Sequence, residues 1–403
     1  MKIIFGFNDI RPDGMGTEAM NLMRSIKRQG IQVQPLHAWN KIDIHGYIEE
    51  FNPIFVADQH EEPRLEDIIA DMVQAVNADK DCMFFSHFGS PNWACIVPYL
   101  RKDIRVIVSV HSITPSALKI ALAYRKRTAA FITISYGVRT KLLKKLSQTE
   151  QDKVHLITNA IDTSLYLPHH ISNSEKSVKI IFFGRIEDVT KGCDKIPQIA
   201  KILKDKGLQF TWDFYGYFHW GYEPRFYQQI KDANVSDVIH YKGCAHPEEI
   251  PEILSHYDIM VMPSNHEGFG LALVEAMAAG LSCVASLIPD VTDMIMESGK
   301  EGFLIARNNI SGFADAIIKL ATNKSLRNSF GNAAIKKVKD NFSLEKQGQQ
   351  YAELFQLLAA TQTYEIIESE TPLEQFTIPS TVKSHILARL LPISVKRLLK
   401  KFI

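Results

Sequence analysis

The chain has 403 residues, too many for one ordinary hydrophobic core, so its length predicts two domains. Hydrophobic residues make up 46% and charged residues 23%, which is the composition of a globular protein. The 46 basic side chains almost balance the 45 acidic ones, and the formal net charge of +1 excludes a general attraction to nucleic acid.

The chain begins with an apolar, β-rich segment at 2–7 that leads into the sequence DGMGTE. A helix is predicted from about Thr17, so Gly14 and Gly16 would lie in the loop between strand and helix. Such a loop faces the ligand crevice of an α/β sheet. A lone G-x-G is weak evidence, however, and an ordinary α/β turn is the alternative.

The strongest strand of the first half is Ile104–Val110, a near-continuous run of valine and isoleucine typical of a strand buried on both faces. His111 follows directly, and polar residues at such a strand end face the crevice. His111 is therefore a candidate site residue, with a purely structural histidine as the alternative. The other predicted elements are strands at 31–36, 52–57, 82–85, 129–134 and 154–157 and helices at 65–76 and from 138.

Residues 168–177 are polar and aperiodic and predict the hinge between the domains. The next strand is 178–183, and Arg185 and Lys191 follow it in a loop where two cations suit a diphosphate. Surface ion pairs are the alternative for both. Further strands are predicted at 209–215, 238–241, 256–263, 282–286, 291–296 and 302–305, and helices at 271–279, 311–321, 324–341 and 342–359.

The sequence HEGFGLALVEAMAAG, at 266–280, is the strongest motif of the chain. A strand precedes it, glycines 268 and 270 let backbone approach a ligand, and the amides of residues 269–271 begin a short apolar helix where phosphate binds well. Glu267 and Glu275 lie eight residues apart, a span that suits hydroxyl groups flanking a diphosphate. A buried helix with incidental acids is the alternative, although burying a lone glutamate is costly.

Glu-x7-Glu within this sequence resembles the donor-site motif of the retaining family-four glycosyltransferases. The resemblance implies that Glu275 holds the ribose hydroxyls of a nucleotide sugar and that Glu267 lies against the sugar. It implies that Arg185 and Lys191 neutralise the leaving nucleoside diphosphate. The implied catalytic set is Glu267, His111, Arg185 and Lys191, and the implied donor-binding set is Gly14, Gly16, Arg185, Lys191, Cys244, Gly268, Phe269, Gly270, Leu271 and Glu275.

The resemblance covers residues 1–360 and implies an α/β protein of the GT-B fold, with two Rossmann-like doubly wound domains facing a cleft. The first domain, on the acceptor side, is expected at 1–168 and the nucleotide-sugar domain at 169–342. A helix at 343–360 is expected to cross back to the first domain, and 361–403 to form a linker and a basic tail.

We therefore expect a retaining transferase that uses a UDP-sugar in preference to a GDP-sugar, with a glycan or lipid-linked acceptor of the bacterial cell envelope. Its cations and helix amides make a metal unnecessary, and no other cofactor is expected. Asp79–Lys80–Asp81 matches a metal-binding D-x-D only at chance-level spacing. A sugar-nucleotide epimerase or phosphorylase of the same fold and an inactive sugar-nucleotide-binding subunit are the rival classes.

The last residues form a basic amphipathic pattern. The chain has no acid beyond Glu374, and a helix over 393–403 would separate four cations from its apolar side. The tail is expected to bind an anionic membrane, to pack on its own domain or to contact a second copy, so the oligomeric state stays open.

Five scattered cysteines without a CxxC pair indicate reduced core thiols, not a disulfide framework or a zinc site. The chain shows no signal-peptide core and no run of 18 apolar residues. These features predict a cytoplasmic protein, peripheral on the inner face of the membrane if the tail binds there.

Overall fold

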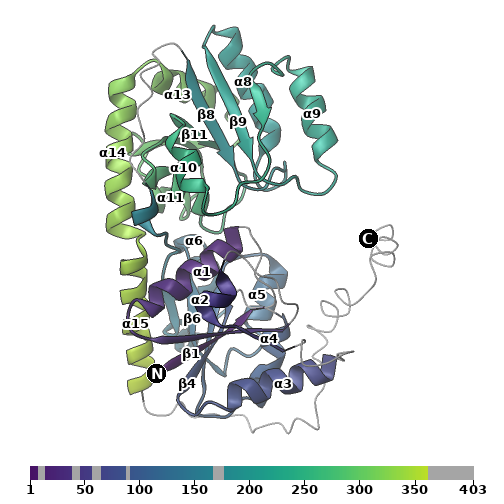
Figure 1. Ribbon diagram of the computed structural model, residues 1–403, viewed down its shortest axis with the longest axis vertical. Coiled ribbons are helices and arrows are strands. Elements are labelled where there is room, and N and C mark those ends of the chain that lie inside the picture. Colours follow the sequence, from purple (N-terminus) through teal and green to yellow (C-terminus); the bar gives the residue numbers. More distant parts are fainter. Residues whose placement is uncertain (8–13, 39–45, 57–64, 88–90, 167–176, 362–403) are drawn as a thin grey trace.

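The computed structural model describes residues 1–7, 14–38, 46–56, 65–87, 91–166 and 177–361. They form two lobes stacked along the long axis of the molecule, each built on one parallel β-sheet (Figure 1). The predicted hinge, apart from its last residue, and the tail beyond residue 361 lie outside the described residues.

The first lobe contains a seven-stranded parallel sheet in the order β3-β2-β1-β4-β5-β6-β7. The order reverses between β1 and β4, and in doubly wound sheets the crevice at this switch point takes the ligand. The strands are β1 (Lys2–Phe7), β2 (Gln32–His37), β3 (Ile54–Phe55), β4 (Cys82–Ser86), β5 (Arg105–Val110), β6 (Thr128–Thr133) and β7 (Val154–Leu156). The α-helices are α1 (Gly14–Lys27), α2 (Tyr47–Phe51), α3 (Leu65–Asn77), α4 (Pro91–Ile96), α5 (Pro115–Ala121), α6 (Tyr136–Leu143) and α7 (Gln148–Gln151).

The second lobe repeats this plan with six strands in the order β10-β9-β8-β11-β12-β13, so its switch point lies between β8 and β11. The strands are β8 (Val178–Phe183), β9 (Phe210–Tyr215), β10 (Ile239–Tyr241), β11 (Ile259–Met262), β12 (Ser282–Leu287) and β13 (Gly302–Ala306). The helices are α8 (Ile196–Asp205), α9 (Glu223–Asp232), α10 (Ile250–Ser255), α11 (Leu271–Ala278), α12 (Thr292–Ile295) and α13 (Ile310–Ala321). The predicted pair of Rossmann-like doubly wound domains is confirmed.

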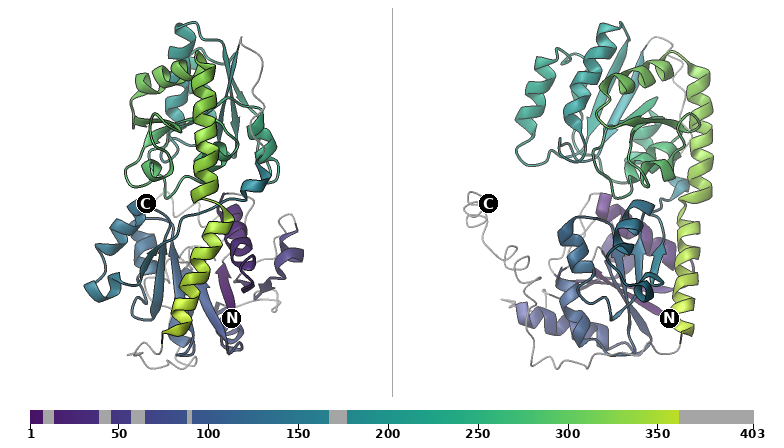
Figure 2. Two further views of the ribbon diagram at one scale, coloured as in Figure 1. Left: turned by 90° about the vertical axis from the view of Figure 1, so that its left-hand side faces the viewer. Right: turned by 180° about the vertical axis from the view of Figure 1, so that it is seen from behind.

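Two helices at the end of the described chain join the lobes along one side (Figure 2). Helix α14 (Lys324–Asn341) packs on the second lobe, and α15 (Leu344–Ala360) packs on α1 of the first. Between these two helices the chain contacts the segment around Ile161, which leads from the first lobe to the second. The Ile161 amide donates to the Phe342 carbonyl at 3.0 Å, and the Leu344 amide donates to the Ile161 carbonyl at 3.1 Å. The predicted crossing helix is confirmed.

The contact between α15 and α1 is close enough to require glycine. A Cβ on Gly348 would lie 2.3 Å from the Ser25 carbonyl oxygen, which is backbone and cannot move aside like a side chain. We expect Gly348→Ala to lower the free energy of unfolding by about 1–3 kcal/mol in urea titrations, although alanine is the better helix former. The exposed neighbour Gln349 provides the control, Gln349→Ala, and equal stability of the two variants would contradict the close packing.

Two predicted elements are wrong. Helix α1 begins at Gly14 and not near Thr17, so Gly14 and Gly16 lie in its first turn. The amides of the first turn have no carbonyl partner within the helix, so glycine destabilises a helix little at these positions. Residues 291–296 are not a strand but contain α12, because the Thr292 hydroxyl donates to the Ser286 carbonyl and accepts from the Ile288 amide, both at 2.8 Å. A short apolar run does not distinguish a strand from a buried helical turn.

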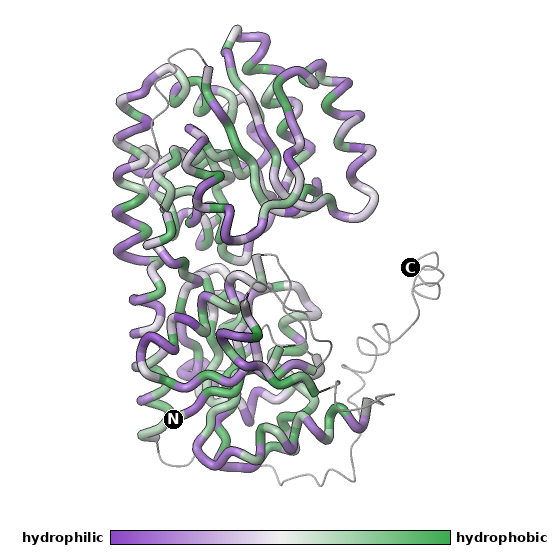
Figure 3. Tube along the Cα trace, in the orientation of Figure 1, coloured by the Kyte–Doolittle hydropathy of each residue, from purple (hydrophilic) through white to green (hydrophobic). Residues whose placement is uncertain are grey.

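The surface helices are amphipathic. Helix α9 alternates between hydrophilic and hydrophobic residues in Figure 3 and buries Phe226 and Ile230. Among the residues that the structure describes, no helix is both long and apolar enough to span a bilayer.

All five cysteines are free thiols, and four of them are buried, as predicted. Cys244 is exposed, so the prediction of a core thiol is wrong for this residue, which follows the edge strand β10.

Candidate active site

The loops after β8 and β11 lie side by side at the switch point of the second sheet. The amides of Asn265 and His266 both donate to the Thr190 carbonyl, at 2.8 and 3.1 Å. The buried Lys195 ammonium donates to the Pro263 carbonyl at 2.8 Å and to the Asn265 side chain at 2.5 Å. These bonds hold the two loops as one unit at the sheet edge where an α/β sheet takes its ligand.

Lys191 and Glu267 form a direct ion pair across these loops. The Lys191 ammonium lies 2.8 and 3.0 Å from the two carboxylate oxygens of Glu267, and the Ser264 hydroxyl donates to the nearer one at 2.7 Å. The Glu267 side chain is 8% exposed and that of Lys191 is 26% exposed. A phosphate group that binds Lys191 must therefore compete with Glu267 for the same ammonium.

Arg185 also has an acidic partner. Its guanidinium lies 2.6 Å from Glu187 and donates to the Thr190 hydroxyl at 3.2 Å. Thr190 is also the residue whose carbonyl binds the loop after β11. The structure therefore brings Arg185, Lys191 and Glu267 into one cluster, with both cations in ion pairs.

The start of α11 lies beside this cluster and touches the first lobe. Gly270 has a left-handed conformation with a φ of 110°, and α11 begins at the next residue. The buried Phe269 ring packs edge-on against Phe342, with centroids 5.7 Å apart. A Cβ on Gly268 would lie 2.3 Å from the His111 carbonyl oxygen. The two lobes therefore meet where the loop of Glu267 touches His111.

Glu275 lies in the second turn of α11 and is buried. Its partner comes from the segment between the lobes, because the Tyr166 hydroxyl donates to a Glu275 carboxylate oxygen at 3.2 Å. Burial raises the pKa of Glu275 to about 7, and the bond from Tyr166 opposes that rise. Glu275, the second glutamate of the motif, therefore has Tyr166 as its partner and does not take part in the Lys191–Glu267 ion pair.

Some predicted site residues lie elsewhere. Gly14 and Gly16 are in the first turn of α1 in the first lobe. Cys244 follows β10, the edge strand, which lies two positions from β8 in the sheet order. Asp79 lies before β4 and pairs with Lys2, at the start of β1, at 3.0 Å. It therefore sits at the amino ends of the strands, the edge opposite the candidate site.

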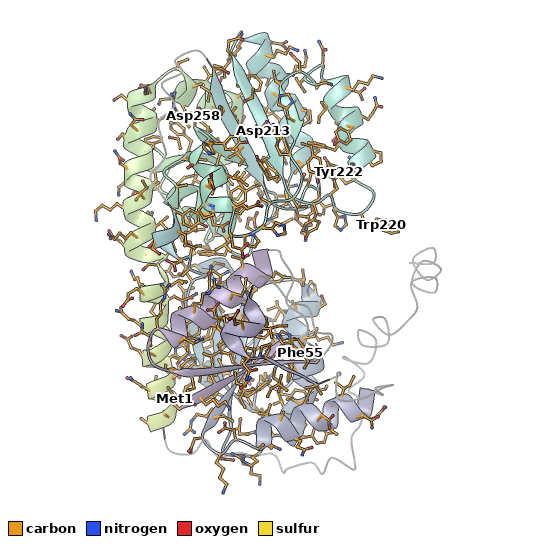
Figure 4. All side chains as sticks on the ribbon, in the orientation of Figure 1. Met1, Phe55, Asp213, Trp220, Tyr222 and Asp258 are labelled. Atoms are coloured by element: carbon orange, nitrogen blue, oxygen red, sulfur yellow. The ribbon has the colours of Figure 1, made fainter. Side chains whose placement is uncertain are left out.

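The sequence did not single out the loop after β9. The Ile186 amide donates to the Tyr217 carbonyl at 2.9 Å, and the His219 amide donates to the Ile186 carbonyl at 3.0 Å, which fixes this loop beside that of Arg185. Trp220 is 74% exposed and points outward on the side of the second lobe away from α14 (Figure 4).

Comparison with known proteins gives a family match within the second lobe. Residues 169–337 match the family described as glycosyl transferases group 1. Arg185, Lys191, Glu267 and Glu275 all lie within the matched residues, whereas His111 lies outside them.

Curated relatives resemble the chain over different lengths. The N-acetyl-alpha-D-glucosaminyl L-malate synthase of Bacillus anthracis is 24% identical over 71% of this chain and 77% of its own. The poly(ribitol-phosphate) alpha-N-acetylglucosaminyltransferase of Staphylococcus aureus is 26% identical over 52% of this chain, but this match spans only 41% of that enzyme. The putative colanic acid biosynthesis glycosyltransferase WcaL of Escherichia coli is 24% identical over 41% of this chain and 42% of its own.

Solved structures share the fold of both lobes. HepE from Anabaena, solved with UDP and glucose, superposes with a TM-score of 0.73 at 17% identity and covers 89% of this chain and 100% of its own. TarM from Staphylococcus aureus, solved as a mutant with UDP, fondaparinux and alpha-GlcNAc-glycerol, has a TM-score of 0.73 at 14% identity over 88% and 99% of the two chains. The predicted GT-B fold is thereby confirmed.

The bond between Tyr166 and Glu275 predicts a pH effect. Because the Tyr166 hydroxyl lowers the pKa of Glu275, Tyr166→Phe should raise that pKa further above the ordinary value. The carboxylate would then form only at higher pH, so the midpoint of the Glu275 titration should move to higher pH. NMR of the labelled carboxyl carbon from pH 6 to 9 measures this shift, and a midpoint identical to that of the wild type would show that Tyr166 does not act on Glu275.

Proposed function

We propose that the protein is a retaining glycosyltransferase that moves a sugar from a UDP-sugar to a glycan or lipid-linked acceptor of the bacterial cell envelope. The observation that carries this proposal is the joined pair of loops after β8 and β11, which places Lys191, Glu267 and Arg185 beside the start of α11. The UDP in the HepE structure and the poly(ribitol-phosphate) in the name of the Staphylococcus aureus relative support the choice of donor and acceptor.

The group that must be stabilised is the leaving nucleoside diphosphate. As the bond between the sugar and the diphosphate breaks, negative charge grows on the phosphate oxygens and positive charge on the sugar ring. In our proposal Lys191 leaves Glu267 and, with Arg185 and the first amides of α11, binds the phosphates. These groups supply the neutralising charge without a metal ion.

The remaining roles follow the positions of the residues. Glu275 binds the ribose hydroxyls, and the loop that contains Cys244 lies near the base. Gly14 and Gly16 bring the first turn of α1 to the diphosphate from the opposite lobe. Glu267, once Lys191 has turned to the phosphates, faces the sugar together with His111, whose backbone touches Gly268. The acceptor hydroxyl attacks from the face that the diphosphate leaves and gives its proton to the departing phosphate oxygen, so the anomeric configuration is kept without a covalent protein intermediate.

A screen of nucleotide sugars tests this function. A transferase releases UDP rapidly only when an acceptor is present, and NMR of the product should show the anomeric configuration of the donor. An epimerase would change the sugar without releasing UDP, a phosphorylase would require inorganic phosphate, and an inactive subunit would bind the donor without turnover. Inversion of the anomeric centre, or any of these three results, would refute the proposal.

We also propose that the basic tail beyond residue 361 holds the enzyme at an anionic membrane. Each cation near an anionic surface contributes on the order of 1 kcal/mol, so six cations suffice for reversible binding. Truncation after Thr361 should abolish cosedimentation with vesicles of phosphatidylglycerol and phosphatidylethanolamine and leave turnover of a soluble acceptor unchanged. Equal cosedimentation of both forms would defeat the anchor, and a change in oligomeric state on truncation would favour a role between copies.

A further inference from the structure

The first lobe has its own acid–base pair at the switch point of its sheet. Glu18, on α1 after β1, and His87, directly after β4, lie with a carboxylate oxygen 2.8 Å from the Nε2 atom of the imidazole. Both side chains are buried, at 4% and 1% exposure. The pair occupies the position in the first sheet that Lys191 and Glu267 occupy in the second, and such positions face the bound ligand in doubly wound folds.

His111 connects this pair to the second lobe. The rings of His87 and His111 lie 5.1 Å apart, and the Nε2 atom of His111 lies 3.1 Å from the Ser109 hydroxyl. The His111 carbonyl oxygen is the atom against which Gly268 packs. Glu18, His87 and His111 therefore lie one behind the other, and the backbone of His111 touches Gly268, the neighbour of Glu267.

The surroundings of the chain are apolar and favour uncharged imidazoles. The Phe7 and Phe85 rings lie 4.9 and 6.3 Å from the His87 ring, and Tyr351 of the crossing helix lies near Glu18. Burial lowers the pKa of His111 to about 4 and that of His87 to about 3, and it raises the pKa of Glu18 to about 7. Among the described residues, Glu18 and His87 are the titratable groups that act on the charge of His111.

The distances favour a direct contact of Glu18 with His87 over a metal centre. One ligand atom from each of the three side chains fits within 4.8 Å, which is close enough for an ion. Two ligands of a tetrahedral zinc ion, each about 2.0–2.1 Å from the metal, lie about 3.3 Å apart. The 2.8 Å between the Glu18 Oε2 and His87 Nε2 atoms is too short for two ligands of one such ion.

A neutral His111 suits the proposed reaction. A protonated imidazole beside the sugar would repel the positive charge that grows on its ring, and this repulsion is strong where water is excluded. A neutral ring places no positive charge beside the sugar.

We propose that Glu18 and His87 are positioning residues that fix the orientation of the His111 imidazole toward the transferred sugar, and that His87 and the apolar surroundings keep this imidazole neutral. This inference rests on the proposed function, because it takes the neighbour of His111 to be the sugar of the donor. It adds two residues of the first lobe, outside the Glu-x7-Glu motif, to the residues that control turnover.

Two substitutions test the inference because they act on His111 in opposite directions. His87 lowers and Glu18 raises the pKa of His111. In full-length protein without ligand, NMR of labelled histidines, assigned with His111→Asn, should show His111 titrating at higher pH in His87→Gln and at lower pH in Glu18→Gln. General structural damage would not produce shifts in opposite directions. The proposal would be overturned if His111 is charged at pH 7 in the wild type, or if both variants show the same shift. The exposed His256 provides a control, His256→Gln, which should leave the titration unchanged.

The kinetic arm uses UDP and UDP-glucose as probes. Both variants should bind UDP within about twofold of the wild type but turn over UDP-glucose at least tenfold more slowly, with the loss in kcat and not in KM. Unchanged kcat would overturn the positioning role, as would stoichiometric zinc in the wild type that His87→Gln removes. If the wild type binds neither probe, the UDP-sugar function fails, whereas the NMR titration still decides whether Glu18 and His87 control His111.

Discussion

Glu275→Ala is expected to weaken binding of UDP and UDP-sugars roughly 100-fold, which corresponds to about 3 kcal/mol. A carboxylate that accepts bonds from two ribose hydroxyls contributes about 1.5–3 kcal/mol per bond, and alanine removes both. Glu275 is a buried carboxyl whose pKa burial raises to about 7, so its removal should leave the fold intact. Calorimetric titration with UDP measures the loss.

The control for this variant is Glu252→Ala, which removes an exposed acid of α10 in the same lobe and should change neither affinity nor stability. The thermal midpoint shows whether Glu275→Ala is folded. A folded Glu275→Ala protein that binds UDP as tightly as the wild type would remove Glu275 from the donor site.

Lys191→Ala is expected to lower kcat about 100- to 1,000-fold, the loss of about 2.7–4 kcal/mol that follows removal of one preorganised charge-stabilising donor. Lys191 also neutralises the largely buried carboxylate of Glu267, so the single substitution should lower the thermal midpoint as well. The double variant Lys191→Ala/Glu267→Gln separates the two effects, because it removes the unpaired charge but does not restore the cation.

We therefore expect the double variant to recover the thermal midpoint while its turnover stays low. Lys300→Ala, which removes an exposed lysine of the same lobe, serves as the control. If the double variant recovers both stability and turnover, Lys191 has only a structural role, and the phosphates must be neutralised by other groups.

The parts of the site that depend on local sequence were predictable. The helix predicted at 271–279 is observed as Leu271–Ala278, because the apolar run and the flanking glycines define its ends in the chain itself. The same holds for β8, which has the predicted bounds of Val178–Phe183.

The pairings were not predictable because they join distant parts of the chain. Lys191 and Glu267 lie 76 residues apart, and Tyr166 and Glu275 lie 109 residues apart. The sequence placed the loops of Arg185 and Glu267 at strand ends but did not show that the two strands are neighbours. The sequence therefore assigned Arg185 and Lys191 to the diphosphate, whereas in the structure both side chains form ion pairs with glutamates.

Glu18 and His87 were missed for a related reason. Each is one polar residue near a strand end, and only the order of the first sheet, with β1 beside β4, brings them together. A search for polar residues after every predicted strand, paired according to the common doubly wound order, would have found them.

A crystal structure of the protein with a UDP-sugar tests the central claim most directly. We predict that the diphosphate lies between the start of α11 and the loop after β8, with Lys191 turned from Glu267 to a phosphate oxygen and Glu275 bound to the ribose. A nucleotide bound elsewhere, with the Lys191–Glu267 pair intact and Glu275 still bound only to Tyr166, would contradict it.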